Sequence, residues 1–212
     1  MAEPMTTLSD YAIALECLLF AGLLLGRGWV ERLWAIAFGS VGGAAAFGGT
    51  IHGFSAVLIR EHHLWLWQGM IIALAIASFS ILAAAAVPLR RWVRLGVLAL
   101  AIVKLALVND LAVSLWSFAI SVADYLSTLI AVFLIQIAQS MGNRQALNPE
   151  PLWLGAGLVI SGLAASVLVI PRSLLPVDPL VGYHLVQMVA LYCIYRSVGD
   201  IGPMSRRTTS ID

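Results

Sequence analysis

Residues 64–87 read LWLWQGMIIALAIASFSILAAAAV, an apolar stretch without a single charged side chain. As an α-helix rising 1.5 Å per residue it reaches about 36 Å, more than the ~30 Å hydrocarbon core of a bilayer. The stretch lacks the period-two alternation of a half-buried strand. Backbone groups in lipid must also bond within their own segment, which favours a helix. This stretch therefore predicts a transmembrane helix.

Six further apolar runs of helix length flank this one, near residues 9–26, 33–59, 92–109, 111–138, 152–170 and 179–198. Each is close to the ~20 residues that span a bilayer core. The composition, 61% hydrophobic and 11% charged, excludes a soluble globular domain. The sequence thus predicts an all-α bundle of seven spans, in which residues 1–212 form a single integral membrane domain.

The arginines are distributed unequally between the two sides that seven spans define. Only Arg60 and Arg172 fall on one side, and nine fall on the other: Arg27, Arg32, Arg90, Arg91, Arg94, Arg144, Arg196, Arg206 and Arg207. Because basic flanks are retained in the cytoplasm, the N-terminus is predicted outside and the C-terminus in the cytoplasm. A formal net charge of +1 without a long basic run argues against nucleic acid as a partner.

Ionisable side chains from four predicted helices lie at similar depth, roughly 7 to 12 Å below the outer interface: Glu16, His52, Lys104 and His184. Burial of such groups in a bilayer costs roughly 2.5 to 3.5 kcal/mol each unless they face partners or water. We therefore expect them to face inward, with Lys104 paired to Glu16 or Asp124. Gln68 lies at a similarly shallow depth, and the whole set predicts a buried polar site in the outer half of the bilayer.

The fifth predicted helix carries a polar stripe, with spacings of 3, 4, 3 and 4 residues: Ser114, Ser117, Ser121, Asp124 and Thr128. This spacing places all five side chains on one helix face. A polar cleft would explain the stripe, and so would hydrogen bonding between helices by the hydroxyl groups. Both interpretations stay open. Ser117 and Ser121 are candidates for buried polar residues that support the predicted site.

His52 projects above a strip of small residues on its own helix, Gly49, Gly48, Ala45 and Gly42. The strip leaves space for a partner helix or a ligand, and small residues in general let membrane helices approach closely. Together with His184 at matched depth, His52 indicates a structural hydrogen bond, a metal site or a proton relay.

Three segments, residues 9–16, 47–53 and 183–192, resemble the corresponding helices of an uncharacterised family of small seven-helix membrane proteins. That family is in turn similar to the CREST superfamily, which includes alkaline ceramidases and adiponectin receptors. The resemblance implies a seven-helix zinc hydrolase of lipid amides, with His52 and His184 as zinc ligands. Three positions depart from the superfamily pattern: Met188 replaces its second seventh-helix histidine, Gly48 its serine and Gln68 its carboxylate.

These observations support three functional hypotheses. The first is a CREST-like metal-dependent hydrolase of a lipid or amphiphile, in which zinc is held by His52 and His184. Glu16 or Asp124 would complete the metal shell or act as base. The second is a non-catalytic subunit of a larger membrane complex or a homo-oligomer, or a protein that binds a pigment, haem or lipid. The third is a proton-coupled transporter that uses Glu16, Lys104 and Asp124.

Overall fold

The computed structural model describes residues 2–111, 117–142 and 149–199, and in these ranges the chain is helical, without strands. It contains seven α-helices and one short 3-10 helix: α1 (Pro4–Leu25), α2 (Trp29–Phe54), α3 (Arg60–Ala86), α4 (Arg91–Leu111), α5 (Ser117–Gly142), α6 (Pro149–Val167), η1 (Arg172–Leu174) and α7 (Pro179–Arg196). The all-α prediction is confirmed for this part of the chain. Ser114, Arg144, Arg206 and Arg207 lie outside the described residues, as does the side chain of Ser117.

Local chemistry explains where the helices begin and end. The side chain of Asp178 accepts a hydrogen bond from the Leu180 N–H at 3.0 Å, which caps α7, and Pro179 follows at its first position. Pro4 opens α1 in the same way. Such prolines fit the first helical turn because its N–H groups have no helical partner.

The helices extend past the predicted apolar runs at several ends. α1 begins at Pro4 rather than near residue 9, and α2 begins at Trp29 rather than near residue 33. Hydropathy marks the part of a helix that lies in lipid, but a helix continues into the interfacial region, where polar side chains are solvated. The early start of α1 places Ser9 and Asp10 well inside a helix.

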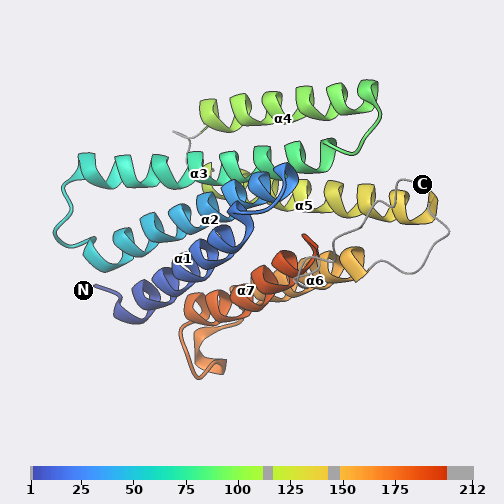
Figure 1. Ribbon diagram of the computed structural model, residues 1–212. Helices are drawn as coiled ribbons and strands as arrows, with labels where there is room; N and C mark the ends of the chain where they lie inside the picture. The colour runs from blue at the N-terminus through green and yellow to red at the C-terminus, as the bar shows by residue number, and fades with distance from the viewer. Residues whose placement is uncertain (1, 112–116, 143–148, 200–212) are drawn as a thin grey trace, which may run out of the picture.

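Six helices form a closed ring in the order α1, α2, α3, α5, α6 and α7, since each contacts the next and α7 returns to α1. α4 packs on the outside of this ring against α3 and α5. Figure 1 shows the helices lying side by side, with α4 along one edge beside α3 and with α6 and α7 on the opposite side. The first and last helices of the chain are therefore neighbours.

Glycines bring α1 and α2 close together, as the glycine-rich second run predicts. A Cβ atom at Gly42 would stand 3.1 Å from the Ala14 carbonyl oxygen, and one at Gly49 would stand 2.9 Å from the Asp10 Cβ. The two backbones approach each other more closely than alanine at these positions would allow.

Aromatic rings fill the interior between α1, α2 and α7, nearer the end of α1 and the start of α2. The rings of Phe20 and Tyr195 stack with their centroids 4.4 Å apart, and Phe38 meets Phe20 edge-on at 5.5 Å. All three side chains are buried. This cluster fixes α7 against α1 and α2.

Five of the described helices are long and apolar enough to cross a membrane: α1, α2, α3, α5 and α6. The 18-residue α7 carries His184, Gln187 and Arg196, which lower its mean hydropathy. The described chain has the character of an integral, multi-pass membrane protein.

Candidate functional site

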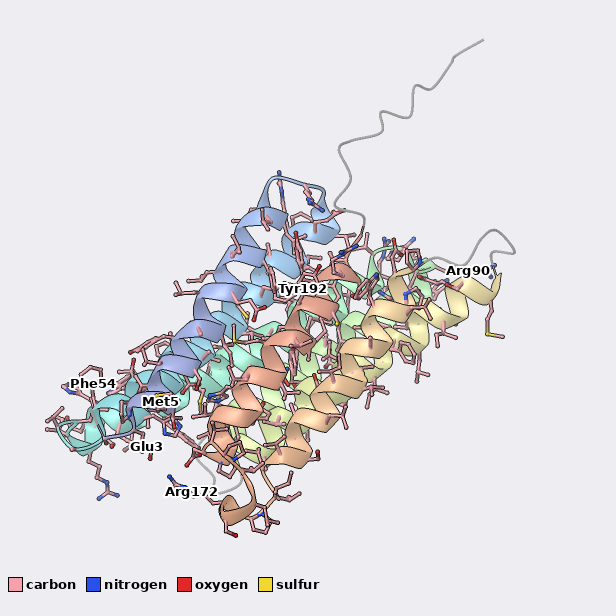
Figure 2. The ribbon with its side chains drawn as sticks, turned by 90° about the horizontal axis from the view of Figure 1, so that it is seen from below. Glu3, Met5, Phe54, Arg90, Arg172 and Tyr192 are labelled. Carbon is pink, nitrogen blue, oxygen red and sulfur yellow. The ribbon has the colours of Figure 1, made fainter. Side chains whose placement is uncertain are left out.

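The start of α1, the end of α2 and the start of α7 meet at one end of the bundle. Figure 2 shows Glu3 and Phe54 at this end, with Arg172 near it, and Arg90 at the opposite end. We call it the Glu3 end. His184 on α7 contacts α1 here, and His52 on α2 contacts Glu3, the residue just before α1.

His184 is held by two consecutive residues of α1. Its Nδ1 lies 2.8 Å from the Ser9 Oγ, and its Nε2 lies 3.3 Å from the Asp10 Oδ1. All three residues are buried, and the side chains of His184 and Asp10 are each 8% exposed. Adjacent α1 residues thus contact both ring nitrogens of one imidazole.

A hydrogen bond and an ion-pair contact hold this group together. The Ser9 hydroxyl donates to the Thr6 carbonyl oxygen at 2.8 Å and also lies 2.8 Å from His184 Nδ1, where the tautomer of the ring decides which atom donates. The other ring nitrogen, Nε2, lies 3.3 Å from the Asp10 Oδ1, so the imidazole and the carboxyl group face each other directly.

The second carboxyl oxygen of Asp10 is buried and has no hydrogen-bond partner. It faces Gly48 of α2, at which a Cβ atom would stand 3.7 Å from this oxygen and 3.6 Å from the other. A buried acceptor without a partner costs about 1 to 3 kcal/mol, so native proteins seldom keep one without a purpose. This oxygen, which we call the orphaned oxygen, is therefore the atom of the site that is free to accept a hydrogen bond from a ligand.

His52 and Glu3 form a second, more exposed pair at the same end. His52 Nδ1 lies 2.8 Å from the Glu3 Oε2, with side-chain exposures of 33% and 55%. His52 is close enough to His184 for the two imidazoles to interact electrostatically, and Glu3 interacts in the same way with Asp10. The buried and the exposed pair form one electrostatic group, which we call the histidine cluster: Glu3, Ser9, Asp10, His52 and His184.

Lys104 and Asp124 lie apart from the histidine cluster, between α4 and α5. Lys104 Nζ is 3.2 Å from the Asp124 Oδ1, and it also donates to the Asp124 carbonyl oxygen, to Ser127 Oγ and to Thr128 Oγ1 at 3.1, 3.1 and 2.7 Å. The lysine is thus paired with Asp124, one of the two carboxylates considered for it. Two of its acceptor residues, Asp124 and Thr128, lie on the predicted stripe of α5, and Ser121 of the same stripe is buried.

The remaining predicted residues lie outside the histidine cluster. Glu16 is half-buried on α1, and one of its carboxyl oxygens is buried without a hydrogen-bond partner. Gln68 is half-buried on α3. The structure therefore brings His52 and His184 together but associates Lys104 and Asp124 with α4 and α5.

The histidine cluster does not fit the donor set of a zinc site. Within the described ranges, no three His, Cys, Asp or Glu side chains are arranged so that they could hold a metal ion. Both ring nitrogens of His184 already contact α1 residues. A catalytic zinc ion needs about three protein ligands, so the imidazole would first have to leave these contacts.

Glu3, Ser9 and Asp10, the members of the histidine cluster at the start of α1 or just before it, were not predicted from the sequence. Because the first span was predicted to begin near residue 9, these residues were assigned to the segment that precedes it. The seven-residue spacing from Ser9 to Glu16 could have indicated them, since two helical turns put both residues on one helix face.

Comparison with known proteins gives a family without an assigned activity. Residues 5–202 match a family described as "Family of unknown function (DUF6962)". No curated protein and no solved structure matches the chain. The uncharacterised family agrees with the resemblance found in the sequence, and none of these comparisons supports the more distant likeness to the CREST superfamily.

Proposed function

Because the chain belongs to DUF6962, a family of unknown function, we propose its function from the geometry of the histidine cluster. We propose that this protein is a seven-span membrane protein that binds the head group of an amphiphile at the Glu3 end. The bound head group donates a hydrogen bond to the orphaned oxygen of Asp10. In this proposal the cluster binds its ligand without a metal ion and without catalysis.

The register between α1 and α7 supports inclusion of α7 among the spans. Ser9 contacts His184 near one end of the two helices, and Phe20 stacks on Tyr195 near the other. Both pairs have the same offset in residue number, so α7 runs parallel to α1 over this length. If α1 crosses the bilayer, α7 crosses beside it.

The pairing of Lys104 supports the inclusion of α4. A lone ammonium group in the bilayer is costly, but this one is neutralised by Asp124 and solvated by hydroxyls of α5. With seven spans, the arginine asymmetry orients the Glu3 end outward. The proposed site then lies in the outer half of the bilayer.

The orphaned oxygen of Asp10 carries the proposal and sets the chemistry of the ligand. Because this buried oxygen lacks a hydrogen-bond donor, a neutral hydroxyl or amine group suffices to satisfy it. An anionic head group would face the Asp10 and Glu3 carboxyl groups and be repelled. The proposal therefore favours a hydroxyl or amine head group over a carboxylate or phosphate.

Three ligands with the same sixteen-carbon chain test this proposal: hexadecanol, hexadecylamine and hexadecanoate. We expect the alcohol or the amine to raise the melting temperature of purified protein by about 5 °C or more near saturation, through linkage between binding and unfolding. Hexadecanoate should give a much smaller shift. Equal shifts with all three would show that only the chain is bound, which would overturn the head-group site.

Two glycine variants on α2 provide a matched comparison. Gly48→Ala adds a methyl group beside both Asp10 oxygens at ordinary contact distance, whereas the added Cβ of Gly43→Ala would meet no atom within 4 Å. We expect Gly48→Ala to lose the stabilisation by ligand and Gly43→Ala to keep it. Metal analysis of the same samples separates this function from hydrolysis by zinc, since stoichiometric zinc that is lost in His52→Ala and His184→Ala would favour the enzyme.

A further inference from the structure

Three buried polar atoms without hydrogen-bond partners lie on α1 and α7. They are the Asp10 Oδ2, the Glu16 Oε2 and the Tyr195 hydroxyl. Within the described ranges, only Ser78 on α3 and Gln136 on α5 have a comparable side-chain atom. The three groups on α1 and α7 can each bind and release a proton, as can the imidazole of His184 beside the first of them.

The register of the two helices orders these groups by depth. Ser9 and Asp10 contact His184, and Phe20 stacks on Tyr195, so Glu16 lies at an intermediate level. At 1.5 Å per residue, Glu16 is about 9 Å further along α1 than Asp10, and the level of Tyr195 is about 6 Å beyond Glu16. Glu16 also shares with Ser9 and Phe20 the face of α1 that is turned toward α7.

Buried polar groups of this kind are ordinarily satisfied by protein or by ordered water, and water bridges gaps that direct hydrogen bonds do not reach. Ionisable residues inside a membrane commonly mark proton or ion pathways. We infer that a proton-transfer path follows the α1–α7 interface, from the Asp10–His184 pair through Glu16 to the hydroxyl of Tyr195. This inference goes beyond the proposed binding site and does not depend on it.

The two ends of the path differ in their access to solvent. At the Glu3 end, the exposed His52–Glu3 pair interacts electrostatically with the buried pair and provides the entrance. At the other end, the ring of Tyr195 is packed against Phe20 and Phe38, and its hydroxyl is buried. Tyr195 is also the next-to-last residue of α7, close to the end of the helix.

Other titratable groups lie near the path on α1, α5 and α7. Cys17 follows Glu16 on α1 and interacts with it electrostatically, and the half-buried Tyr125 of α5 interacts with Cys17 and Tyr183. Tyr183 precedes His184 and interacts with Asp10. These thiols and phenols are the titratable neighbours of the path besides its own members and the two histidines.

Proton flux into vesicles tests the path directly. The full-length protein is reconstituted in phosphatidylcholine vesicles that enclose a pH-sensitive dye, and a potassium gradient with valinomycin drives proton entry. We expect the wild-type protein to acidify the interior faster than protein-free vesicles do. A wild-type rate equal to that of empty vesicles would overturn the inference.

Conservative variants identify the groups that carry the flux. Glu16→Gln keeps the size of the side chain but cannot exchange a proton, and Tyr195→Phe keeps the stacked ring but removes the hydroxyl. Both should reduce the flux toward that of protein-free vesicles. Tyr192→Phe is the matched control on α7, because its hydroxyl bonds to Arg196 and its side chain is largely exposed. Wild-type flux in both Glu16→Gln and Tyr195→Phe would contradict the assignment.

Infrared difference spectroscopy provides a second measurement that does not require flux. A pH jump should change the carboxyl stretching band of Glu16 in the wild-type protein, and this change should be missing in Glu16→Gln. Loss of the proposed binding site would appear in a separate measurement, because hexadecanol and hexadecylamine would then no longer raise the melting temperature. If the Glu16 variant keeps those shifts while it loses flux, the two functions are independent.

Discussion

At the residue scale, the contact between Gly49 and α1 permits a sharp test of close packing. A Cβ at Gly49 would stand 2.9 Å from the Asp10 Cβ and 3.3 Å from the Thr7 carbonyl oxygen, too close for either neighbour to remain in place. We expect Gly49→Ala to lower the free energy of unfolding by about 1 to 3 kcal/mol, as for other overpacked sites. Equilibrium unfolding in mixed detergent micelles measures this change.

Gly43→Ala is the control for that experiment, since its added Cβ meets no atom within 4 Å. Alanine is the better helix former by about 1 kcal/mol in water, so this variant should be neutral or slightly stabilised. Equal stability of the two alanine variants would contradict the close approach of α1 and α2.

The histidines were predictable from the sequence, whereas the partners of His184 were not. An imidazole inside an apolar run is conspicuous, so His52 and His184 stand out without a structure. Ser9 and Asp10 lie where charge and polarity are unremarkable, at the edge of a hydropathy window. The glycine strip beside His52 did predict a neighbour, and Gly49 contacts Asp10 and Thr7 of α1.

At the element scale, Lys104 connects α4 to α5 of the ring, whereas the larger contact of α4 is with α3. Its ammonium group has four acceptors on α5, including the Asp124 carboxylate, which is 8% exposed. Lys104→Met would leave that carboxylate buried without its countercharge. We expect a loss of about 3 kcal/mol in the free energy of unfolding.

A double variant separates loss of the ion pair from loss of packing. Lys104→Met combined with Asp124→Leu removes both charges, so it should be more stable than Lys104→Met alone. Hydrogen exchange of α4 amides should rise in the single variant and return toward the wild-type rate in the double one. An unchanged exchange rate in the single variant would show that other contacts hold α4.

The polar stripe of α5 illustrates what spacing can and cannot predict. A spacing of 3 and 4 residues reliably places side chains on one helix face. It does not say what covers that face. In the structure, Asp124 and Thr128 bind the lysine of α4, so hydrogen bonding between helices accounts for this part of the stripe.

At the scale of the whole molecule, the proposed seven-span topology predicts which loops can be labelled from outside. Arg172→Cys and Arg90→Cys place thiols at exposed positions near opposite ends of the bundle. Intact cells should label the first with a membrane-impermeant maleimide, and the second only after permeabilisation. The native Cys17 and Cys193 are buried, so the wild-type protein provides the unlabelled control. Labelling of both engineered thiols in intact cells would exclude the topology.

Neither the depth of Glu16 nor the position of the helices around the ring was predictable. Residue number, converted to height through the helical rise, grouped Glu16, His52, Lys104 and His184 at one level. Both histidines do lie at the Glu3 end, but Glu16 lies two helical turns further along α1 than Ser9, the partner of His184. Height leaves the order of helices around the ring undetermined, and α4 lies outside it. The predicted single site therefore separates into the histidine cluster and the Lys104–Asp124 pair.

The closure of the ring by α1 and α7 has a consequence for biogenesis. Helices leave the ribosome in order, so Ser9 and Asp10 wait in the nascent protein until the final helix supplies His184. A truncated product that lacks α7 retains a carboxyl group in the membrane without its imidazole partner. Quality control can recognise an incomplete chain by this unpaired carboxyl group. The pairing with His184 removes the difference once synthesis is complete.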